Sequence, residues 1–273
     1  MTSPKPERPP TAVIDPLKRP GPPIGFGTIV TFIIAALFIG SLAAIGFTPE
    51  RLIEVPAGVA RVLSFFWPAD MAYGWDRVLP AIVESIQIAW IGTIIAAILS
   101  LPLALFGSRV LFPRVARGVK LVSATARAFP EILLAIYFVP IVGLGAFAGA
   151  LAIGISSVGM LTKLGAEVVD SLDFGTVEAV EAAGGSRLLA LRWAVLPAVL
   201  PEIVAHWLFR FELNIRASAV LGVVGAGGVG GVLLNTLRYR HFDKAAAVLI
   251  LTILVVLAID MLSGEIRRRI IRS

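Results

Sequence analysis

The stretch VEAVEAAGGSRLLALRWAVLP, Val177–Pro197, is a polar segment inside a very apolar chain. Two glutamates, a pair of glycines and two arginines interrupt sequence that is otherwise mostly aliphatic. The 273 residues are 58% hydrophobic and only 15% charged, with a mean hydropathy of +0.91. Soluble domains carry about 25% charged residues, so this chain has too many apolar side chains for one soluble core. The composition predicts an all-α membrane protein in which this segment is a polar connection.

Uncharged runs divide most of the chain into six predicted membrane-spanning helices. The run between Ile132 and Thr162 has about 31 residues and would measure about 46 Å as one helix, too long for one crossing of a hydrocarbon core of about 30 Å. Proline and glycine residues predict a tight turn that divides it into a third and a fourth span, at Pro140, Gly143, Gly145 and Gly149. The third span begins near Val119, and the other five cover about residues 27–47, 81–106, 147–168, 198–220 and 245–262.

Basic residues lie at alternate ends of these helices and indicate the orientation of the chain. Cytoplasmic loops of membrane proteins carry an excess of lysine and arginine. Such residues precede the first span, follow the second and end the chain in RRRIIRS, so both termini are predicted to be cytoplasmic. These loops also explain the net charge of +6, and the expected partner is the lipid bilayer rather than nucleic acid. Arg238, Arg240 and Lys244 fall on the outer side and are the exception.

The polar segment has the pattern of a short helical hairpin. Thr176 can cap a first helix whose first turn contains Glu178, and a carboxylate is favourable at that positive end of the helix dipole. Gly184 and Gly185 end this helix because glycine tolerates a left-handed turn, and Ser186 can cap a second helix. Inner-leaflet lipids are anionic, so the acidic edge favours insertion into a groove of another protein over an amphipathic loop on the membrane surface.

This segment resembles the cytoplasmic signature of ABC importer permeases. The match consists of Glu178-Ala179-Val180, Gly184 six residues after the glutamate, and Leu196-Pro197. Val180 stands where alanine is usual and Ala194 where isoleucine is common, and both replacements are small or apolar. The upstream ARAFPEILLAIYFVPIVGLGAFAGALA and the downstream LFRFELNIRASAVLGVVGAGGVG resemble phosphonate-type (PhnE-like) permease subunits, and the similarity covers about residues 80–270.

The resemblance implies a type I ABC importer permease fold in a bacterial cytoplasmic membrane. The implied partners are a second copy of the chain, two cytosolic ABC ATPase subunits that use ATP and Mg²⁺, and an external substrate-binding protein. The chain itself is expected to bind no cofactor and to have no catalytic residue. Residues 176–187 would form the coupling helix, and the residues expected to couple the chain to the ATPase are Glu178, Ala179, Glu181, Gly184, Gly185, Ser186, Arg187, Leu196 and Pro197.

The expected organisation has five parts. They are a disordered Pro-rich cytoplasmic tail (residues 1–26), a first transmembrane helix (27–47), an external loop with an interfacial helix (48–80), the permease transmembrane domain (81–265) and a basic cytoplasmic tail (266–273).

The function implied by the resemblance is import of a phosphonate or a related phosphorus oxyanion, such as phosphate or phosphite, by alternating access. One alternative is a secondary transporter or channel for a small anion, driven by an ion gradient, although no convincing internal repeat supports it. Another is an ABC permease for a different small solute, such as methionine or betaine. An intramembrane enzyme would need a catalytic pair or a metal cluster, and neither is visible.

Nucleotide and metal motifs are missing or lack their structural context. The G-x-x-x-x-G-K-[ST] motif does not occur, so any ATP must bind to another polypeptide. Gly225–Gly230 matches G-x-G-x-x-G but follows a membrane span rather than a strand, and is interpreted as backbone packed beside the pathway. The chain has no cysteine and its histidines, His206 and His241, are isolated, so no metal site is expected.

Charged residues within the spans give the candidate substrate pathway, because intramembrane charges are costly. Arg127 and Glu131, like Glu212 and Arg216, are four residues apart and can pair along a helix. Arg210 has no opposite charge at helical spacing and is the leading candidate for contact with an anion. Asp260 and Glu265 are expected to pair with the arginine tail. The predicted pathway residues are Arg210, Asn214, Arg216, Gly225, Gly227 and Gly228.

Overall fold

The structure is a computed structural model that describes residues 26–173 and 175–272. The first 25 residues of the predicted N-terminal tail, and Ser273, lie outside the described residues. All regular elements in the described part of the chain are helices. The chain divides into two units, residues 1–61 and 62–273, and each is considered by itself.

The first unit contains a single apolar helix, α1 (Phe26–Ala44), and the start of α2 (Pro49–Phe65). No charged residue occurs in α1, which is long and apolar enough to cross a membrane, as predicted for the first span. Its end is set by Gly46, which has a φ of +65°, while the amide of Phe47 donates to the carbonyl of Leu42. This glycine-terminated turn satisfies carbonyl groups at the helix end. The helix α2 is amphipathic and corresponds to the helix predicted in the external loop.

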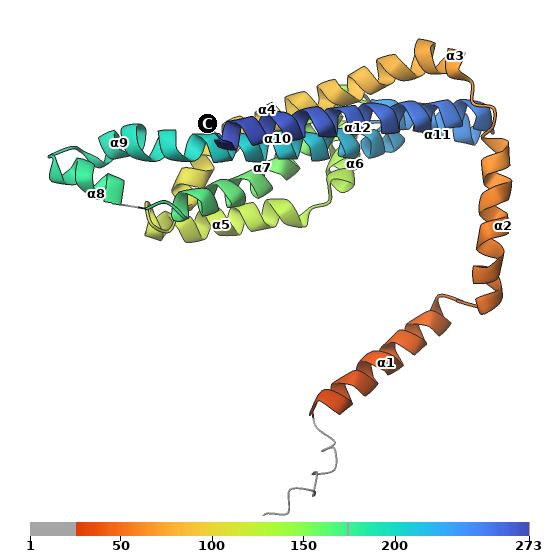
Figure 1. The fold of residues 1–273 in the computed structure, drawn as a ribbon, viewed down its shortest axis with the longest axis horizontal. Helices are drawn as coiled ribbons and strands as arrows, with labels where there is room; N and C mark the ends of the chain where they lie inside the picture. Colours follow the sequence, from red (N-terminus) through yellow and green to blue (C-terminus); the bar gives the residue numbers. More distant parts are fainter. Residues whose placement is uncertain (1–25, 174, 273) are drawn as a thin grey trace, which may run out of the picture. The chain divides into compact units, whose positions relative to one another are not determined.

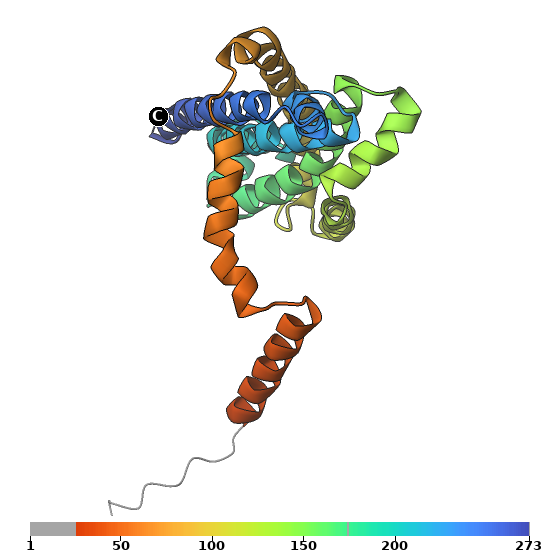
Figure 2. The same cartoon turned by 90° about the vertical axis from the view of Figure 1, so that its right-hand side faces the viewer.

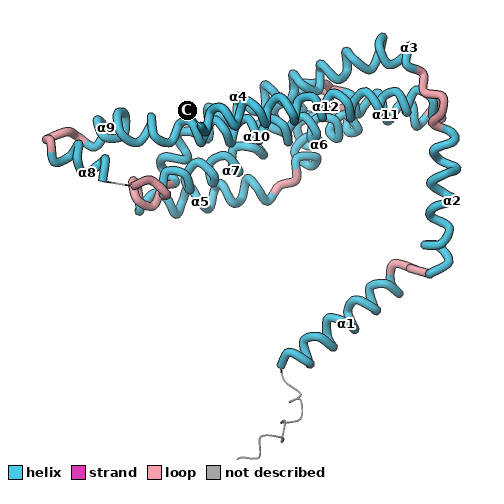
Figure 3. Tube along the Cα trace, viewed as in Figure 1, coloured by secondary structure: helices cyan, strands magenta, loops and turns pink. Residues whose placement is uncertain are grey.

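The second unit is a bundle of long helices. In Figures 1 and 2 its long helices lie side by side, and the tube in Figure 3 shows only helices and their connecting loops. Five helical runs in the described chain are long and apolar enough to span a membrane, and a bent pair of helices brings the number to six. The first run in this unit is continuous through three elements: α3 (Met71–Tyr73), the π-helical η1 (Gly74–Val78) and α4 (Leu79–Gly107). The other three contain α7 (Ala146–Asp170), α10 (Leu196–Leu221) and α12 (Phe242–Arg272).

The helix α7 lies at the centre of this unit and packs against α4, α5, α6 and α10. Small residues bring α7 and α4 close together. A Cβ atom added to Gly92 would lie 2.7 Å from Cγ2 of Ile153, and one added to Gly165 would lie 2.8 Å from Cβ of Ala104. Lipid offers no hydrophobic drive for helix association, so such close van der Waals packing is a main source of stability between membrane helices.

The third predicted span is bent rather than straight. The helix α5 (Pro113–Ala128) and the helix α6 (Glu131–Val142) meet at an angle of 83°. The cause is Pro130, because a proline disfavours helical conformation in the preceding residue; Phe129 is extended, with ψ of 120°. The continuous third helix predicted to carry Arg127 and Glu131 one turn apart is therefore wrong. The turn predicted after it is confirmed, since Gly143 and Gly145 have φ of +92° and +126° between α6 and α7.

The connection between α7 and α10 is the predicted helical hairpin. It contains α8 (Gly175–Ala182), α9 (Arg187–Ala190) and the π-helical turn η2 (Leu191–Val195), which leads directly into α10. After α10 follow the short η3 (Gly222–Val224) and α11 (Val229–Arg238). The last helix, α12, extends beyond the sixth predicted span and includes residues 266–272 of the predicted basic tail.

Candidate functional site

The α8–α9 hairpin, residues 175–190, lies at one end of the second unit (Figure 1). Gly184 has a φ of +82°, and its amide donates to the carbonyl of Glu181, while the amide of Gly185 donates to that of Val180. These two bonds close a glycine-terminated helix end. The hydroxyl of Ser186 accepts a hydrogen bond from the amide of Leu189 at 3.3 Å. The glycine pair thus ends the first helix and Ser186 caps the second, as predicted from the sequence, whereas the side chains of Thr176 and Arg187 lie outside the described residues.

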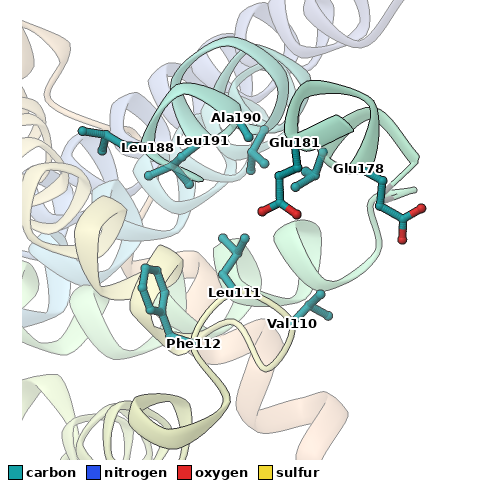
Figure 4. Close-up of a pocket in the computed structure, with 10 residues that line it drawn as sticks. Val110, Leu111, Phe112, Glu178, Glu181, Leu188, Ala190 and Leu191 are labelled. Carbon is teal, nitrogen blue, oxygen red and sulfur yellow. The ribbon is translucent and has the colours of Figure 1, made fainter. Parts of the chain in front are cut away.

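An apolar recess of about 420 Å³ lies beside the hairpin. Figure 4 shows Leu111 and Phe112, from the turn between α4 and α5, on one side of it and Leu188 and Leu191 on the other. Glu181 and Glu178 both line this recess, with Glu181 nearer to Leu111 (Figure 4). Both glutamates are exposed. The hairpin therefore presents acidic side chains beside an apolar surface at this end of the bundle.

Asp170, at the end of α7, holds the neighbouring turn in place. Its carboxylate accepts hydrogen bonds from the hydroxyl of Ser108 at 2.6 Å and from the amide of Arg109 at 2.8 Å, and Lys120 lies 3.5 Å away. A carboxylate is unfavourable at the negative end of a helix dipole, and these donors compensate it. Asp170 thereby fixes the α4–α5 turn against α7, directly before the hairpin. Local sequence patterns give no signal for this cluster, because its partners lie about 50 to 62 residues apart.

A second polar cluster, the Arg210 cluster, lies between α4, α6, α7 and α10. Arg210 is only 8% exposed, forms an ion pair with Glu131 through Nη2 and donates from Nε to the hydroxyl of Ser157 at 2.8 Å. Ser157 in turn donates to Asn214 at 3.2 Å, and the Asn214 side-chain amide donates to Thr93 at 2.9 Å. These hydrogen bonds therefore connect α10 to α7 through Ser157 and to α4 through Thr93.

The ion pairs differ from those predicted within single helices. Glu131 pairs with Arg210, and Arg127 donates to the carbonyl of Gly159 at 3.0 Å, because the bend at Pro130 separates the two helices. Arg210, predicted to have no opposite charge nearby on its helix, is neutralised from α6, which local spacing could not reveal.

The predicted pair between Glu212 and Arg216 is also wrong. Arg216 pairs with Asp260 of α12 at 2.8 Å, so Asp260 does not pair with the arginine tail. Glu212 is buried, and its Oε1 atom has no hydrogen-bond partner among the described residues. The prediction for Glu265 is confirmed, since it pairs with Arg268 at 2.7 Å and Arg269 at 3.2 Å.

The glycines of the predicted pathway lie apart from the Arg210 cluster, in the connection from η3 to α11. Gly225, Gly227 and Gly228 have φ between +80° and +84°. The carbonyl of Gly225 accepts from the amide of Gly145, and the hydroxyl of Ser85 accepts from the amide of Val229 at 2.9 Å. These glycines connect helices, not a strand and a helix. Of the six predicted pathway residues, Arg210 and Asn214 belong to the Arg210 cluster, the three glycines lie together in this connection, and Arg216 pairs with Asp260.

A recess of about 350 Å³ adjoins the Arg210 cluster, and it is called the arginine recess here. Its side chains carry two guanidinium groups and one carboxylate. Arg127 belongs to it and is not among the predicted pathway residues, because helical spacing predicts a local pair with Glu131 instead. The lining residues are Arg127, Phe129, Pro130, Glu131, Ser156, Met160 and Arg210.

Comparisons with known proteins agree with this architecture. Residues 100–272 match the family described as "Binding-protein-dependent transport system inner membrane component". The phosphite transport system permease protein PtxC of Stutzerimonas stutzeri is 34% identical over 247 residues, covering 90% of this chain and 86% of that protein. The phosphate-import permease protein PhnE of Mycolicibacterium smegmatis is 39% identical over 193 residues; the match covers 70% of this chain but only 36% of that protein.

Solved structures show the same fold. A chain of the MetNI methionine ABC transporter in an inward-facing conformation has a TM-score of 0.62 at 19% identity, covering 71% of this chain and 95% of that one. A chain of a bacterial alginate ABC transporter has a TM-score of 0.60 at 12% identity, covering 89% of this chain and 97% of that one. The predicted all-α permease fold is thereby confirmed.

Proposed function

The chain belongs to the family of binding-protein-dependent transport system inner membrane components, and from this premise we propose that it imports a phosphorus oxyanion such as phosphite, phosphate or a phosphonate. It is a multi-pass permease subunit of an ABC importer in the bacterial inner membrane. The observation that carries the substrate proposal is the similarity to the phosphite permease protein over 90% of the chain. A recess that contains two arginines and one glutamate is consistent with an anionic substrate.

In this proposal, the energy for transport comes from ATPase subunits that bind the α8–α9 hairpin. The sequence contains no P-loop of its own. The hairpin continues through η2 into α10, and the Asp170 cluster ties the adjacent turn to α7. Movement of the hairpin is therefore transmitted to the two helices that carry Arg210, Ser156 and Ser157.

We further propose that two copies of the chain enclose the pathway and that an external binding protein delivers the substrate. Phe129 and Pro130, which line the arginine recess, are exposed on the single chain, and in this proposal a second subunit covers them. Closure of the ATPases would move the two bundles relative to each other and open the pathway alternately to each side, as rigid-body rotations of subunits do.

The substrate proposal is tested by uptake into proteoliposomes that contain the permease, its ATPase and its binding protein. Phosphite, methylphosphonate and phosphate are compared with methionine and glycine betaine, with and without ATP inside. We expect ATP-dependent uptake of at least one phosphorus oxyanion, at a rate at least tenfold above that of methionine. Preferential uptake of methionine or betaine would contradict the substrate class. Uptake by the chain alone, driven by an ion gradient, would contradict the importer mechanism.

A further inference from the structure

The Arg210 guanidinium is held in a fixed position, but some of its N–H donors form only weak or long hydrogen bonds. Ser157 accepts from Nε at 2.8 Å and is itself fixed by Asn214. Nη1 donates to the sulfur of Met160 at 3.5 Å, and a thioether is a weak acceptor. Nη2 faces Glu131, with the hydroxyl of Ser156 at 3.5 Å. Arg210 is thus oriented like a preformed anion-binding group whose outer edge borders the arginine recess.

Glu131 is placed so that its carboxylate can leave Arg210. It is the first residue of α6, immediately after the bend at Pro130, and its side chain is 25% exposed whereas that of Arg210 is 10% exposed. Breaking a buried ion pair is costly when it leaves one charge uncompensated. The carboxylate therefore needs a replacement anion if it is to leave Arg210.

The charges around the recess favour a small oxyanion as that replacement. Arg127 and Arg210 contribute two positive charges and Glu131 one negative charge, so the charged side chains that line the recess carry a net charge of +1. Arg127 comes from α5 and Arg210 from α10, so the recess joins cations from separate helices. A guanidinium binds oxyanions of this type through two parallel hydrogen bonds, and fixed positive groups suit a multivalent oxyanion better than a zwitterion.

We propose that the arginine recess is a transit site for the phosphorus oxyanion, in which Glu131 acts as a built-in counter-ion that the substrate displaces. The inference rests on the proposed function and deepens it. When the recess is empty, Glu131 neutralises Arg210 and keeps the buried guanidinium paired. When the oxyanion enters, it takes the place of the carboxylate on Arg210 and is also held by Arg127. Departure of the anion allows Glu131 to return, which favours release.

The test uses the assembled permease–ATPase complex without its binding protein, with phosphite as the ligand and sulfate as the comparison anion. Thermal unfolding and direct titration are compared for the wild type, Glu131→Gln, Arg127→Gln and Arg210→Lys. Glu131→Gln is expected to lower the unfolding midpoint by about 5 °C, since Arg210 loses the negative charge of its partner. Phosphite should then raise that midpoint at least twice as much as in the wild type, and its Kd should fall about tenfold because the competing carboxylate is gone.

Removal of either cation has the opposite effect on binding. Arg127→Gln is expected to raise the Kd for phosphite about tenfold with little change in the unfolding midpoint, because Arg127 donates to a backbone carbonyl rather than pairing with Glu131. Arg210→Lys should weaken binding at least as much, since a lysine cannot form two parallel bonds. Glu265→Gln is the matched control: it removes a carboxylate from an exposed ion pair and should leave the Kd unchanged.

The outcomes separate the transit site from the substrate proposal. If Glu131→Gln is destabilised and phosphite restores no more stability than in the wild type, the ion pair only joins α6 to α10, and the transit site is refuted. Should Glu131→Gln fail to assemble, Glu131→Asp serves instead; its shorter side chain should lower the Kd, and an unchanged or higher Kd refutes the site. If sulfate, but not phosphite, produces the stabilisation, the counter-ion site stands and the proposed substrate class is wrong.

Discussion

Asp170 shows how one side chain can link the membrane bundle to the region beside the hairpin. It accepts from Ser108 and from the amide of Arg109, and it lies near Lys120, so its carboxylate joins the end of α7 to the α4–α5 turn. That turn contributes Leu111 and Phe112 to the recess beside the hairpin. A force applied to the hairpin would therefore reach α4 and α7 through this cluster.

Asp170→Asn is expected to weaken both stability and coupling. An asparagine side chain has one acceptor oxygen and no charge, so the cluster loses part of its hydrogen bonding, at a cost of about 1 to 3 kcal/mol in the free energy of unfolding. Transport per ATP hydrolysed should fall, which is measured as uptake and ATPase activity in the same proteoliposomes. Glu167→Gln, in an exposed pair with Lys163, is the control. Equal effects of the two substitutions would argue against a special role for Asp170.

At the scale of elements, the α8–α9 hairpin depends on one glycine for its conformation and on another for space. Gly184 has a φ of +82°, but a Cβ atom there would meet nothing within 4 Å. Gly185 has a different constraint, because an added Cβ would lie 2.6 Å from Cγ1 of Val180. A substitution at Gly184 therefore strains the turn and adds a side chain to its outer surface, where a partner would bind.

Gly184→Leu is expected to reduce transport and stimulated ATPase activity at least tenfold while the membrane helices remain folded. The left-handed conformation costs about 1 to 2 kcal/mol for a residue with a Cβ atom, and the leucine side chain would obstruct docking. Gly184→Asn is the matched comparison, because asparagine tolerates this conformation better and should retain more activity. Full activity of Gly184→Leu would show that this turn takes no part in coupling.

The bend between α5 and α6 shows what sequence analysis can and cannot predict here. Hydropathy predicted the spans, and glycine and serine positions predicted the hairpin, because these features depend on local composition. The Phe129-Pro130 step was a local signal for the bend, but the uncharged run beyond it favoured one continuous helix. The Glu131–Arg210 pair joins residues 79 positions apart, so helical spacing could not predict it. The two residues meet because α6 packs against α10.

At the scale of the whole molecule, close packing favours movement of the bundle as a rigid body. Gly92 and Gly154 bring α4 and α7 together so closely that an added Cβ at either position would lie 2.7 or 3.2 Å from an isoleucine side chain. Close-packed protein interiors have low compressibility and transmit displacement with little deformation. A displacement of the hairpin should therefore rotate α4, α7 and α10 together as one rigid body, rather than change the packing between these helices.

The central claim is that a separate ATPase binds the hairpin on the cytoplasmic side, and a single cysteine tests it most directly. The chain has no native cysteine, so Glu178→Cys introduces a unique thiol, with Arg240→Cys as the control at the opposite end. In the assembled complex, Glu178→Cys should react only with cytoplasmic reagents and should cross-link to the ATPase. Arg240→Cys should react only from outside and should not cross-link to the ATPase. Labelling of Glu178→Cys from outside, or a cross-link to the ATPase through Arg240→Cys alone, would contradict the account.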